Sequence, residues 1–579
     1  MNDRFFKRNL LALSRSDPGL GDRLLAVESD DRLELRNARS GAPVPLLRLA
    51  GREAAFHSLV DPEREADRLC AAQPPGGFIV ALGLGAGYAL RRYLASTATT
   101  GLLVVEYSAA LLRALLEKLD LSELFIDERF SLILDPKPEE LSARLLSIYV
   151  PPLAGDLRSL PLRGRVDLDK DKFENAADAV REVLGIISDD YSVQAFFGKL
   201  WLKNAARNLF ASEGGGAPLP SVRKAVVAAA GPSLETAMPV LVKAKAEGAF
   251  LIATDTSLPA LVGRGLAPDA VISIDCQHIS YYHFLGGLPR STPLVLDLSS
   301  PNGLARLGAP LRFFSSGHPF CAYISSHFRA FPALDTSGGN VTHAALSLAE
   351  ALGSEETLLA GADFSYPEGK SYARGTYIYG YFGQRSGRLS PEEALFSGFV
   401  FRNAAVSREE DRTEDGKIFS RYLTKPLMSY KEHLERFAAR SAMSILPLRD
   451  KGVAIATPKR AKPPRRERRV FAPGPAAKSA RAFLEGYAAG LRALPEPRDP
   501  WLRYLGALAP EERDLWTTLL PASSALQREA RDRALQREAR DRALQREARD
   551  RALAPAELLE ATRIWALRTI EEALELGKG

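Results

Sequence analysis

The order of apolar strands, glycine turns and amphipathic helices predicts two α/β units along the chain. An apolar run, "GGFIVALGLGAGYALRRYL", has the pattern of a strand, a glycine turn and a helix, and "TGLLVVEYS" follows as the next strand. From Lys224, "KAVVAAAGPSLETAMPVLVKAKAEGAFLIATD" repeats this arrangement. Alternating short strands and helices favour parallel sheets with helices on both faces. We therefore expect an α/β fold with two successive Rossmann-like, doubly wound units and an α-helical C-terminal region.

The pattern divides the chain into six segments, which is in keeping with its length. They are an N-terminal α+β segment (1–75), a Rossmann-like domain (76–165), a helical connector (166–215), a central domain (216–455), a basic proline-rich linker (456–475) and a helical C-terminal region (476–579).

Polar residues follow several strands of the central domain. The turn Gly231-Pro232-Ser233 comes after one strand, and Asp255 and Asp275 end the strands that come later. In an open parallel sheet the carboxyl ends of the strands form the ligand crevice, so we expect these residues to converge there. In the first unit, Glu106 at a strand end has the same placement, which suits either a nucleotide or adenosyl group or a packed layer without a ligand.

The stretch "GGNVTHAALSLAEALGSEETLLAGAD" places two glycines before a helix and an aspartate after the next strand. Backbone N–H groups at a helix start attract anions, and a carboxylate at a strand end can bind sugar hydroxyls. A nucleotide would satisfy both features.

Composition limits the classes of protein that remain. The chain has 579 residues, 46% hydrophobic and 26% charged, which excludes wholesale disorder. No apolar run is long enough for a membrane span, and the N-terminal stretch lacks the pattern of a secretory signal, so we expect a cytoplasmic protein. The three cysteines, far apart in sequence, predict no disulfide framework and no zinc site.

The net charge of +6 is local, because Pro458–Arg469 ("PKRAKPPRRERR") alone accounts for it. Proline and charge both oppose packing, which predicts a solvated linker; a docking strip for an acidic surface is the alternative. No nucleic-acid motif accompanies the strip. Further on, "ALQREARDR" occurs three times between Ala525 and Arg551. Its period places successive leucines on opposite sides of a helix, so we expect a mostly solvated helix rather than a coiled coil.

The blocks "AAAGPSLE", "ATDTSLPALVGRGLAPDAVISID" and "GGNVTHAALSLAEALGSEETLLAGADFSYPEGKSYARG" resemble the motility accessory factor family of bacterial flagellin glycosyltransferases. That family shares a domain with 6-hydroxymethylpterin diphosphokinase (MptE)-like proteins. The last block is also similar to a bacterial sialyltransferase family that uses CMP-sialic acid. The resemblance implies a GT-A-like or sialyltransferase-like central domain.

The resemblance also implies an activity. The implied enzyme transfers a nonulosonic acid, of the pseudaminic or legionaminic type, from a CMP-activated donor to Ser or Thr of flagellin. The resemblance implies that this modification is needed for flagellar assembly and motility. A divalent metal requirement and the oligomeric state stay open, and no nucleic-acid partner is implied. The implied substrate-binding residues are Gly231, Pro232, Ser233, Asp255, Asp275, Thr336, Ser337, Gly338, Gly339, Gly361 and Asp363.

Tyrosines help the leaving phosphate in such sialyltransferases, and Tyr372 and Tyr377 are the candidates here. A histidine acts as base in that family, but its expected position after Asp363 is filled only by His433, on an amphipathic segment. His343, in the first turn after the glycine loop, is the alternative, with a cap or packing role equally open.

Three other functions fit parts of the pattern. A pterin pyrophosphokinase would use Asp255, Asp275 and Asp363 around Mg²⁺ and ATP phosphates. A flagellin-binding accessory protein without catalysis would account for the missing base. A methyltransferase using "GLGAGY" is the weakest, because no partner catalytic motif follows.

Overall fold

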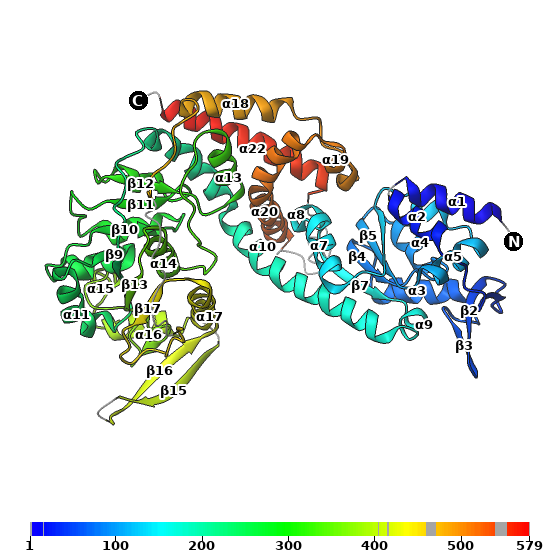
Figure 1. The fold of residues 1–579 in the computed structure, drawn as a ribbon, viewed down its shortest axis with the longest axis horizontal. Coiled ribbons are helices and arrows are strands. Elements are labelled where there is room, and N and C mark those ends of the chain that lie inside the picture. The colour runs from blue at the N-terminus through cyan, green and yellow to red at the C-terminus, as the bar shows by residue number, and fades with distance from the viewer. Residues whose placement is uncertain are drawn as a thin grey trace. The chain divides into compact units, whose positions relative to one another are not determined.

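The computed structural model describes residues 3–15, 17–402, 405–413, 416–458, 470–538 and 553–577. It divides into two compact units, described separately below (Figure 1). Unit 1 comprises Met1–Gly198 and Ala493–Trp565, and unit 2 comprises Lys199–Arg492 and Ala566–Gly579. The expectations for the basic strip, and for the repeats beyond residue 538, concern residues outside the described ones.

Unit 1 is built on a parallel sheet of four strands in the order β6-β5-β4-β7. Its strands are β4 (Gly77–Leu82), β5 (Thr99–Glu106), β6 (Phe130–Leu134) and β7 (Leu157–Pro161). Helices α4 (Tyr88–Ala95) and α5 (Ala109–Lys118) follow β4 and β5 and contribute to one buried apolar cluster with the sheet. This is the Rossmann-like arrangement predicted from the sequence.

An antiparallel meander precedes this sheet, formed by β1 (Leu33–Asn37), β2 (Pro43–Leu49) and β3 (Arg52–Ala55). The other helices of unit 1 are α1 (Asp3–Ser14), α2 (Pro18–Ala26), α3 (Pro62–Ala72), α6 (Ser122–Phe125), α7 (Pro138–Ile148), α8 (Pro151–Ala154), α9 (Arg163–Val166), α19 (Trp501–Ala507) and α20 (Pro510–Glu538). Two helices, α10 (Lys170–Ser212) and α22 (Pro555–Leu576), contribute residues to both units.

The first "ALQREARDR" copy lies at the end of α20 and is partly packed. Ala525 and Gln527 are buried, and the Gln527 amide donates to the carbonyl of Leu553 at 3.1 Å and accepts from its N–H at 3.0 Å. The expectation of a mostly solvated helix is therefore wrong for this copy. The sequence period showed which residues share a helix face but not that another segment covers it.

Unit 2 contains a parallel sheet of seven strands in the order β12-β11-β10-β9-β8-β13-β17. The strands are β8 (Lys224–Ala228), β9 (Phe250–Thr254), β10 (Ala270–Ser273), β11 (Leu294–Asp297), β12 (Leu311–Phe314), β13 (Glu356–Ala360) and β17 (Ser444–Pro447). The chain adds strands in one direction from β8 to β12 and then places β13 on the other side of β8. This reversal makes the β8/β13 pair a topological switch point.

Successive side chains along each strand point to opposite faces of this sheet. Val227, Ile252 and Ile272 belong to one apolar cluster, together with residues of α14 (Val341–Ala351) and α17 (Lys425–Arg440). Helix α11 (Leu234–Ala246) packs against β8. Because right-handed crossovers that run in opposite directions lie on opposite faces, α11 and α14 cover different faces and both begin at the carboxyl edge.

A small subdomain is inserted between β13 and β17. It contains the antiparallel sheet β14-β16-β15 and two short helices. Its elements are β14 (Tyr366–Pro367), α15 (Tyr377–Gly383), α16 (Glu392–Val400), β15 (Val406–Arg412) and β16 (Ile418–Thr424). The remaining helices of the unit are α12 (Leu258–Val262), α13 (Pro319–His327), α18 (Ala480–Ala493) and the 3-10 segments η1 (Asp255–Ser257), η2 (His278–Phe284) and η3 (Asn302–Arg306). Within the described ranges, no helix has the length and apolar character needed to cross a bilayer.

Candidate active site

The segments that follow β8 and β13 are joined at the switch point. The Gly231 N–H donates to the Gly361 carbonyl at 2.8 Å, and the Ser233 N–H donates to Asp363 Oδ2 at 2.9 Å. Gly231 is required because a Cβ there would collide with the Asp363 carboxylate and the Gly361 carbonyl. Two motifs far apart in sequence, Gly-Pro-Ser and Gly-x-Asp, therefore form one structural element.

Asp363 lies inside this element. Its side chain is 5% exposed and lies against Gly231 and Gly452, where any Cβ would meet its carboxylate. Burial raises the pKa of Asp363, and the hydrogen bond from Ser233 opposes that rise. The sequence predicted a contact between Asp363 and a nucleotide, which stays a prediction. In the structure its Oδ2 accepts from the Ser233 N–H, so the carboxylate also supports the Ser233 turn.

The Ser233 hydroxyl belongs to the same turn and lies close to the Asp363 carboxylate. Ser233 is 4% exposed, and its hydroxyl, like its N–H, interacts with the Asp363 carboxylate and opposes the rise in the pKa of that group. A hydroxyl has two acceptor lone pairs as well as its donor, so Ser233 Oγ can also accept a hydrogen bond from a ligand at this turn.

The two strand-end aspartates come together beyond β9 and β10. Asp255 is buried; its Oδ2 accepts from Ser273 Oγ at 2.7 Å, and its Oδ1 accepts from the Thr256 N–H at 2.7 Å. Asp275 accepts from the Gln277 N–H at 2.9 Å. Burial raises the pKa of Asp275, and the negative charge of Asp255 raises it further.

Both predicted tyrosines lie within electrostatic reach of Asp255. Burial raises the pKa of Tyr372 and of Tyr377, and Asp255 adds to both shifts through its charge. The Tyr377 ring meets the His283 ring edge-on, with centroids 4.6 Å apart.

His283 is a functional candidate that the sequence reasoning missed. It is 9% exposed, and its Nδ1 has no hydrogen-bond partner within the described part of the chain. It lies close enough to Asp275 for a positive charge on its ring to oppose the rise in the pKa of that carboxyl. The signal in the sequence was the His- and Tyr-rich stretch "HISYYHF" (His278–Phe284) directly after Asp275.

The loop Thr336–Gly339 leads into α14 as expected. Asp335 accepts from the N–H and hydroxyl of Ser337 at 2.9 and 2.6 Å, and the Asn340 side chain caps the helix by accepting from the His343 N–H at 3.0 Å. No described residue accepts from the N–H groups of Val341 and Thr342. These two amides are therefore free to meet an anion.

His343 itself lies beneath the loop. It is 1% exposed, its Nε2 is 3.3 Å from Asp335 Oδ2, and its ring packs edge-on against Phe437 with centroids 4.9 Å apart. Burial lowers the pKa of His343, and the Asp335 charge opposes this shift. A Cβ at Gly338 would collide with the ring, so His343 supports the loop backbone. The contacts found for the His343 ring are with Asp335, Phe437 and Gly338 and do not include Tyr372 or Tyr377.

Helix α10 fixes the loops after β10 and β11. The Asn204 amide donates to the carbonyls of Cys276 and Ser299 at 3.0 and 2.9 Å. The Asn208 amide donates to Leu298 and Ser300 at 2.9 and 2.7 Å. These contacts could not be predicted from the sequence, because the two asparagines lie within a long helical stretch. Across the described residues, no group of three or more His, Cys, Asp or Glu side chains is arranged to hold a metal ion.

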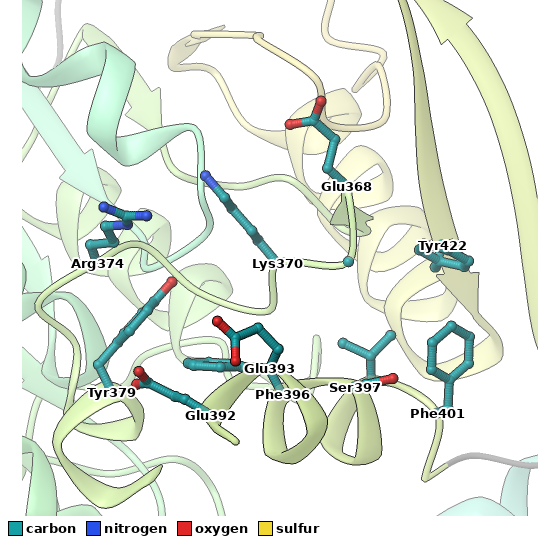
Figure 2. Close-up of a pocket in the computed structure, with 12 residues that line it drawn as sticks. Glu368, Lys370, Arg374, Tyr379, Glu392, Glu393, Phe396, Ser397, Phe401 and Tyr422 are labelled. Atoms are coloured by element: carbon teal, nitrogen blue, oxygen red, sulfur yellow. The ribbon is translucent and has the colours of Figure 1, made fainter. Parts of the chain in front are cut away.

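A pocket of about 450 Å³ adjoins this edge of the sheet (Figure 2). It lies between α16 and the loop after β14, and that loop is tied to the switch point by hydrogen bonds from Ala373 N–H to the Ala230 carbonyl (2.8 Å) and from Arg374 N–H to Glu235 Oε1 (2.9 Å). Its lining consists of Glu368, Gly369, Lys370, Arg374, Tyr379, Glu392, Glu393, Phe396, Ser397, Val400, Phe401 and Tyr422.

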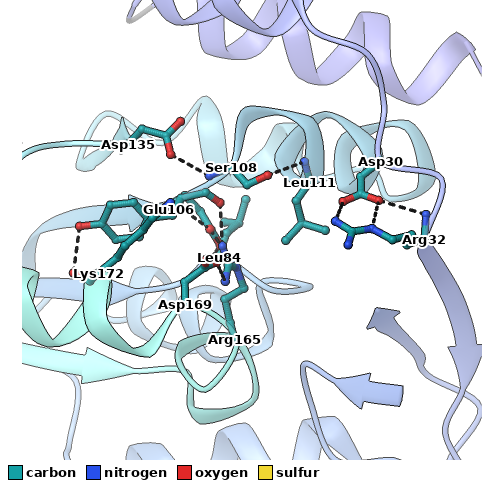
Figure 3. A network of polar contacts seen from close by, with 11 residues as sticks. Asp30, Arg32, Leu84, Glu106, Ser108, Leu111, Asp135, Arg165, Asp169 and Lys172 are labelled. Carbon is teal, nitrogen blue, oxygen red and sulfur yellow. Dashed lines mark hydrogen bonds and ion pairs between the residues drawn. The ribbon is translucent and has the colours of Figure 1, made fainter. Parts of the chain in front are cut away.

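The glycine turn of unit 1 is filled by the chain itself (Figure 3). Glu106 accepts from the Leu84 N–H at 2.8 Å and pairs with Arg165 Nε at 3.1 Å, so its oxygens are occupied. His57 Nε2 accepts from the Ala86 N–H at 2.9 Å. The cavity beneath the turn has a volume of about 20 Å³, room for about one water. Of the two alternatives for this unit, the structure favours a packed layer.

Known proteins resemble parts or all of this chain. Residues 201–369 match the family described as 6-hydroxymethylpterin diphosphokinase MptE-like. An uncharacterized protein of Treponema pallidum (strain Nichols) is 40% identical over 158 residues, which span 27% of this chain and 54% of the relative. The match thus spans about half the length of that relative.

A second uncharacterized protein of Treponema pallidum is 30% identical over 167 residues, 28% of this chain and 79% of that protein. Among solved structures, a MAf glycosyltransferase from Magnetospirillum magneticum AMB-1 has the same fold, with a TM-score of 0.53 and 15% identity over 100% of this chain and 96% of that one. The chain therefore belongs to the same family as this second treponemal protein, carries an MptE-like domain and has the fold of a MAf glycosyltransferase, in agreement with its resemblance to the motility accessory factor family.

Proposed function

We propose that the protein is a glycosyltransferase that moves a nonulosonic acid from a CMP-activated donor to a Ser or Thr hydroxyl of flagellin. The observation that carries the proposal is the switch point, where the Gly231–Ser233 turn and the free amides of α14 lie on one edge of the sheet. The likeness to the MAf glycosyltransferase fold supports the reaction class.

Each part of the edge has a role in this reaction. The free N–H groups of Val341 and Thr342 would bind the CMP phosphate, whose charge grows as the bond to the sugar breaks. The Ser233 hydroxyl would hydrogen-bond the nucleotide, and Asp363 would hold that turn in place.

Bond formation needs little covalent help from the protein. The acceptor oxygen bonds to the anomeric carbon, the bond from that carbon to the phosphate oxygen breaks, and CMP leaves with the electron pair. His283 would take the proton of the acceptor hydroxyl, since it is the histidine near Asp275 and Tyr377. A tyrosine with a raised pKa, such as Tyr377, keeps its proton and can donate to the leaving phosphate.

Incubation of the protein with CMP-activated nonulosonic acid and purified flagellin tests the proposal. Mass spectrometry of flagellin should show the added sugar, and CMP release should depend on flagellin. Unmodified flagellin with no CMP release would refute it. The MptE-like match favours a second candidate, a pterin pyrophosphokinase, which would instead convert ATP to AMP in the presence of 6-hydroxymethylpterin and Mg²⁺.

A further inference from the structure

The pocket beside the switch point is lined by charged groups of both signs. Lys370 and Arg374 come from the loop after β14, and Glu392 and Glu393 come from the first turn of α16 (Figure 2). None of these four side chains forms an ion pair with a described residue. Glu368 differs, because it pairs with Lys451 at 2.7 Å. Four charges without ion-pair partners in one concave site indicate a ligand that brings its own polar groups.

Aromatic side chains supply the apolar part of the lining. Tyr379 packs against Phe396 with ring centroids 4.7 Å apart, and Phe401 meets Tyr422 edge-on at 5.1 Å. Phe401 is 50% exposed, so part of its ring can be reached from solvent. Ring faces of this kind accept the C–H surfaces and acyl groups of a small ligand.

We propose that this pocket binds a sugar ring that carries a carboxylate. Lys370 and Arg374 would bind the carboxylate, Glu392 and Glu393 would accept hydrogen bonds from hydroxyl or acylamino N–H groups, and Phe396 would pack against the ring. A volume of about 450 Å³ accommodates one such ring.

The pocket lies next to the proposed nucleotide site. The loop that carries Lys370 and Arg374 is bonded to Ala230 and Glu235, on either side of the Gly231–Ser233 turn. A nucleotide bound at that turn therefore has the pocket as its neighbour, and the sugar of a donor would enter it. The inference rests on the proposed function for the identity of the donor, but the pocket's chemistry is argued from its own side chains.

The probe is N-acetylneuraminic acid, with its methyl ester as the uncharged analogue, titrated against the full chain by ligand-observed NMR. The acid should bind more tightly than the ester. Lys370→Gln should lower the affinity for the acid about tenfold to a hundredfold and leave the affinity for the ester unchanged. Glu393→Gln should lower the affinity for both the acid and the ester. Lys243→Gln and Glu247→Gln serve as matched controls, because these two residues form an exposed pair at the C-terminal end of α11. Both variants should bind the acid and the ester as the unsubstituted protein does.

Equal affinity for the acid and the ester, no binding of the acid, or unchanged binding by Lys370→Gln would each overturn the proposal. A parallel titration with CMP separates this result from the proposed function. If CMP binds normally and the acid does not, the pocket assignment alone fails. If CMP does not bind while the acid does, the pocket stands and the CMP-dependent reaction fails.

Discussion

The carboxylate of Asp363 accepts a hydrogen bond from the backbone N–H of Ser233 at 2.9 Å and so joins the turn after β8 to the segment after β13. Both residues are almost fully buried, and the two strands are the pair at which the sheet order reverses. The backbone geometry of the proposed nucleotide site therefore depends on an aspartate that lies beneath it.

Asp363→Ala should lower both stability and CMP affinity. It leaves the Ser233 N–H without its acceptor and a space between two glycines, which predicts a loss of about 1–3 kcal/mol. Asp363→Asn retains an acceptor oxygen and should recover part of the loss. Thermal unfolding and CMP titration measure the two effects. An unfolding midpoint for Asp363→Ala equal to that of the unsubstituted protein would show that the bond does not support the turn.

His283→Gln should reduce the rate of sugar transfer by a factor of about 10²–10⁴, the usual contribution of a general base. CMP affinity should stay the same, because the side chain is assigned to the acceptor hydroxyl and not to the nucleotide. The measurement is kcat from CMP release with flagellin, beside the CMP dissociation constant. His433→Gln, on α17, is the matched histidine control. Equal rates for both variants would exclude His283 as the base.

Acid should destabilise the protein through His343. Burial lowers the pKa of His343 in the folded chain below its unfolded value of about 6.5, so the unfolded state binds a proton first as the pH falls. The stabilising effect is complete above that unfolded pKa and is lost as the pH drops towards the folded one. His343→Gln should therefore show a weaker decline of the unfolding midpoint between about pH 7 and pH 5. An equal decline of the unfolding midpoint with falling pH in both proteins would show that His343 is not the group responsible.

Arg165→Met should strongly destabilise unit 1. It leaves the buried Glu106 carboxylate without its cation, a change that costs about 3–5 kcal/mol. Arg163→Met removes a nearby exposed arginine and should change little. Thermal unfolding of the two variants gives the comparison. Equal midpoints would indicate that the Glu106–Arg165 pair does not hold the glycine turn closed.

Much of the fold could be predicted because short apolar strands, glycine turns and amphipathic helices are local features. Gly231 and Gly361 could be identified from the sequence because each comes shortly after such a strand. The pattern at Glu106 left two alternatives open, because a strand-end acid binds a ligand in an open site and forms a salt bridge in a filled one. Only the position of Arg165, which lies far along the chain, decides between them.

The chemistry of the site was harder to foresee because it depends on contacts between distant segments. His283 becomes a candidate only when α15 brings Tyr377 beside it. The structural role of Asn204 and Asn208 can be recognised only once α10 is seen to contact the loops after β10 and β11. Asp363 was placed correctly at a strand end, but its orientation towards Ser233 depends on strand order, which the sequence pattern does not fix.

Calorimetric titration with CMP, and separately with ATP and Mg²⁺, tests the central claim most directly when it is repeated on Thr342→Asp and Thr342→Asn. An aspartate in the first turn of α14 suits the helix but repels a phosphate at its free amides, whereas the neutral asparagine does not. The account predicts that CMP binds in preference to ATP, and that Thr342→Asp weakens CMP about tenfold or more while Thr342→Asn retains it. Preference for ATP, or equal CMP binding by both variants, would contradict a CMP-sugar site at this edge of the sheet.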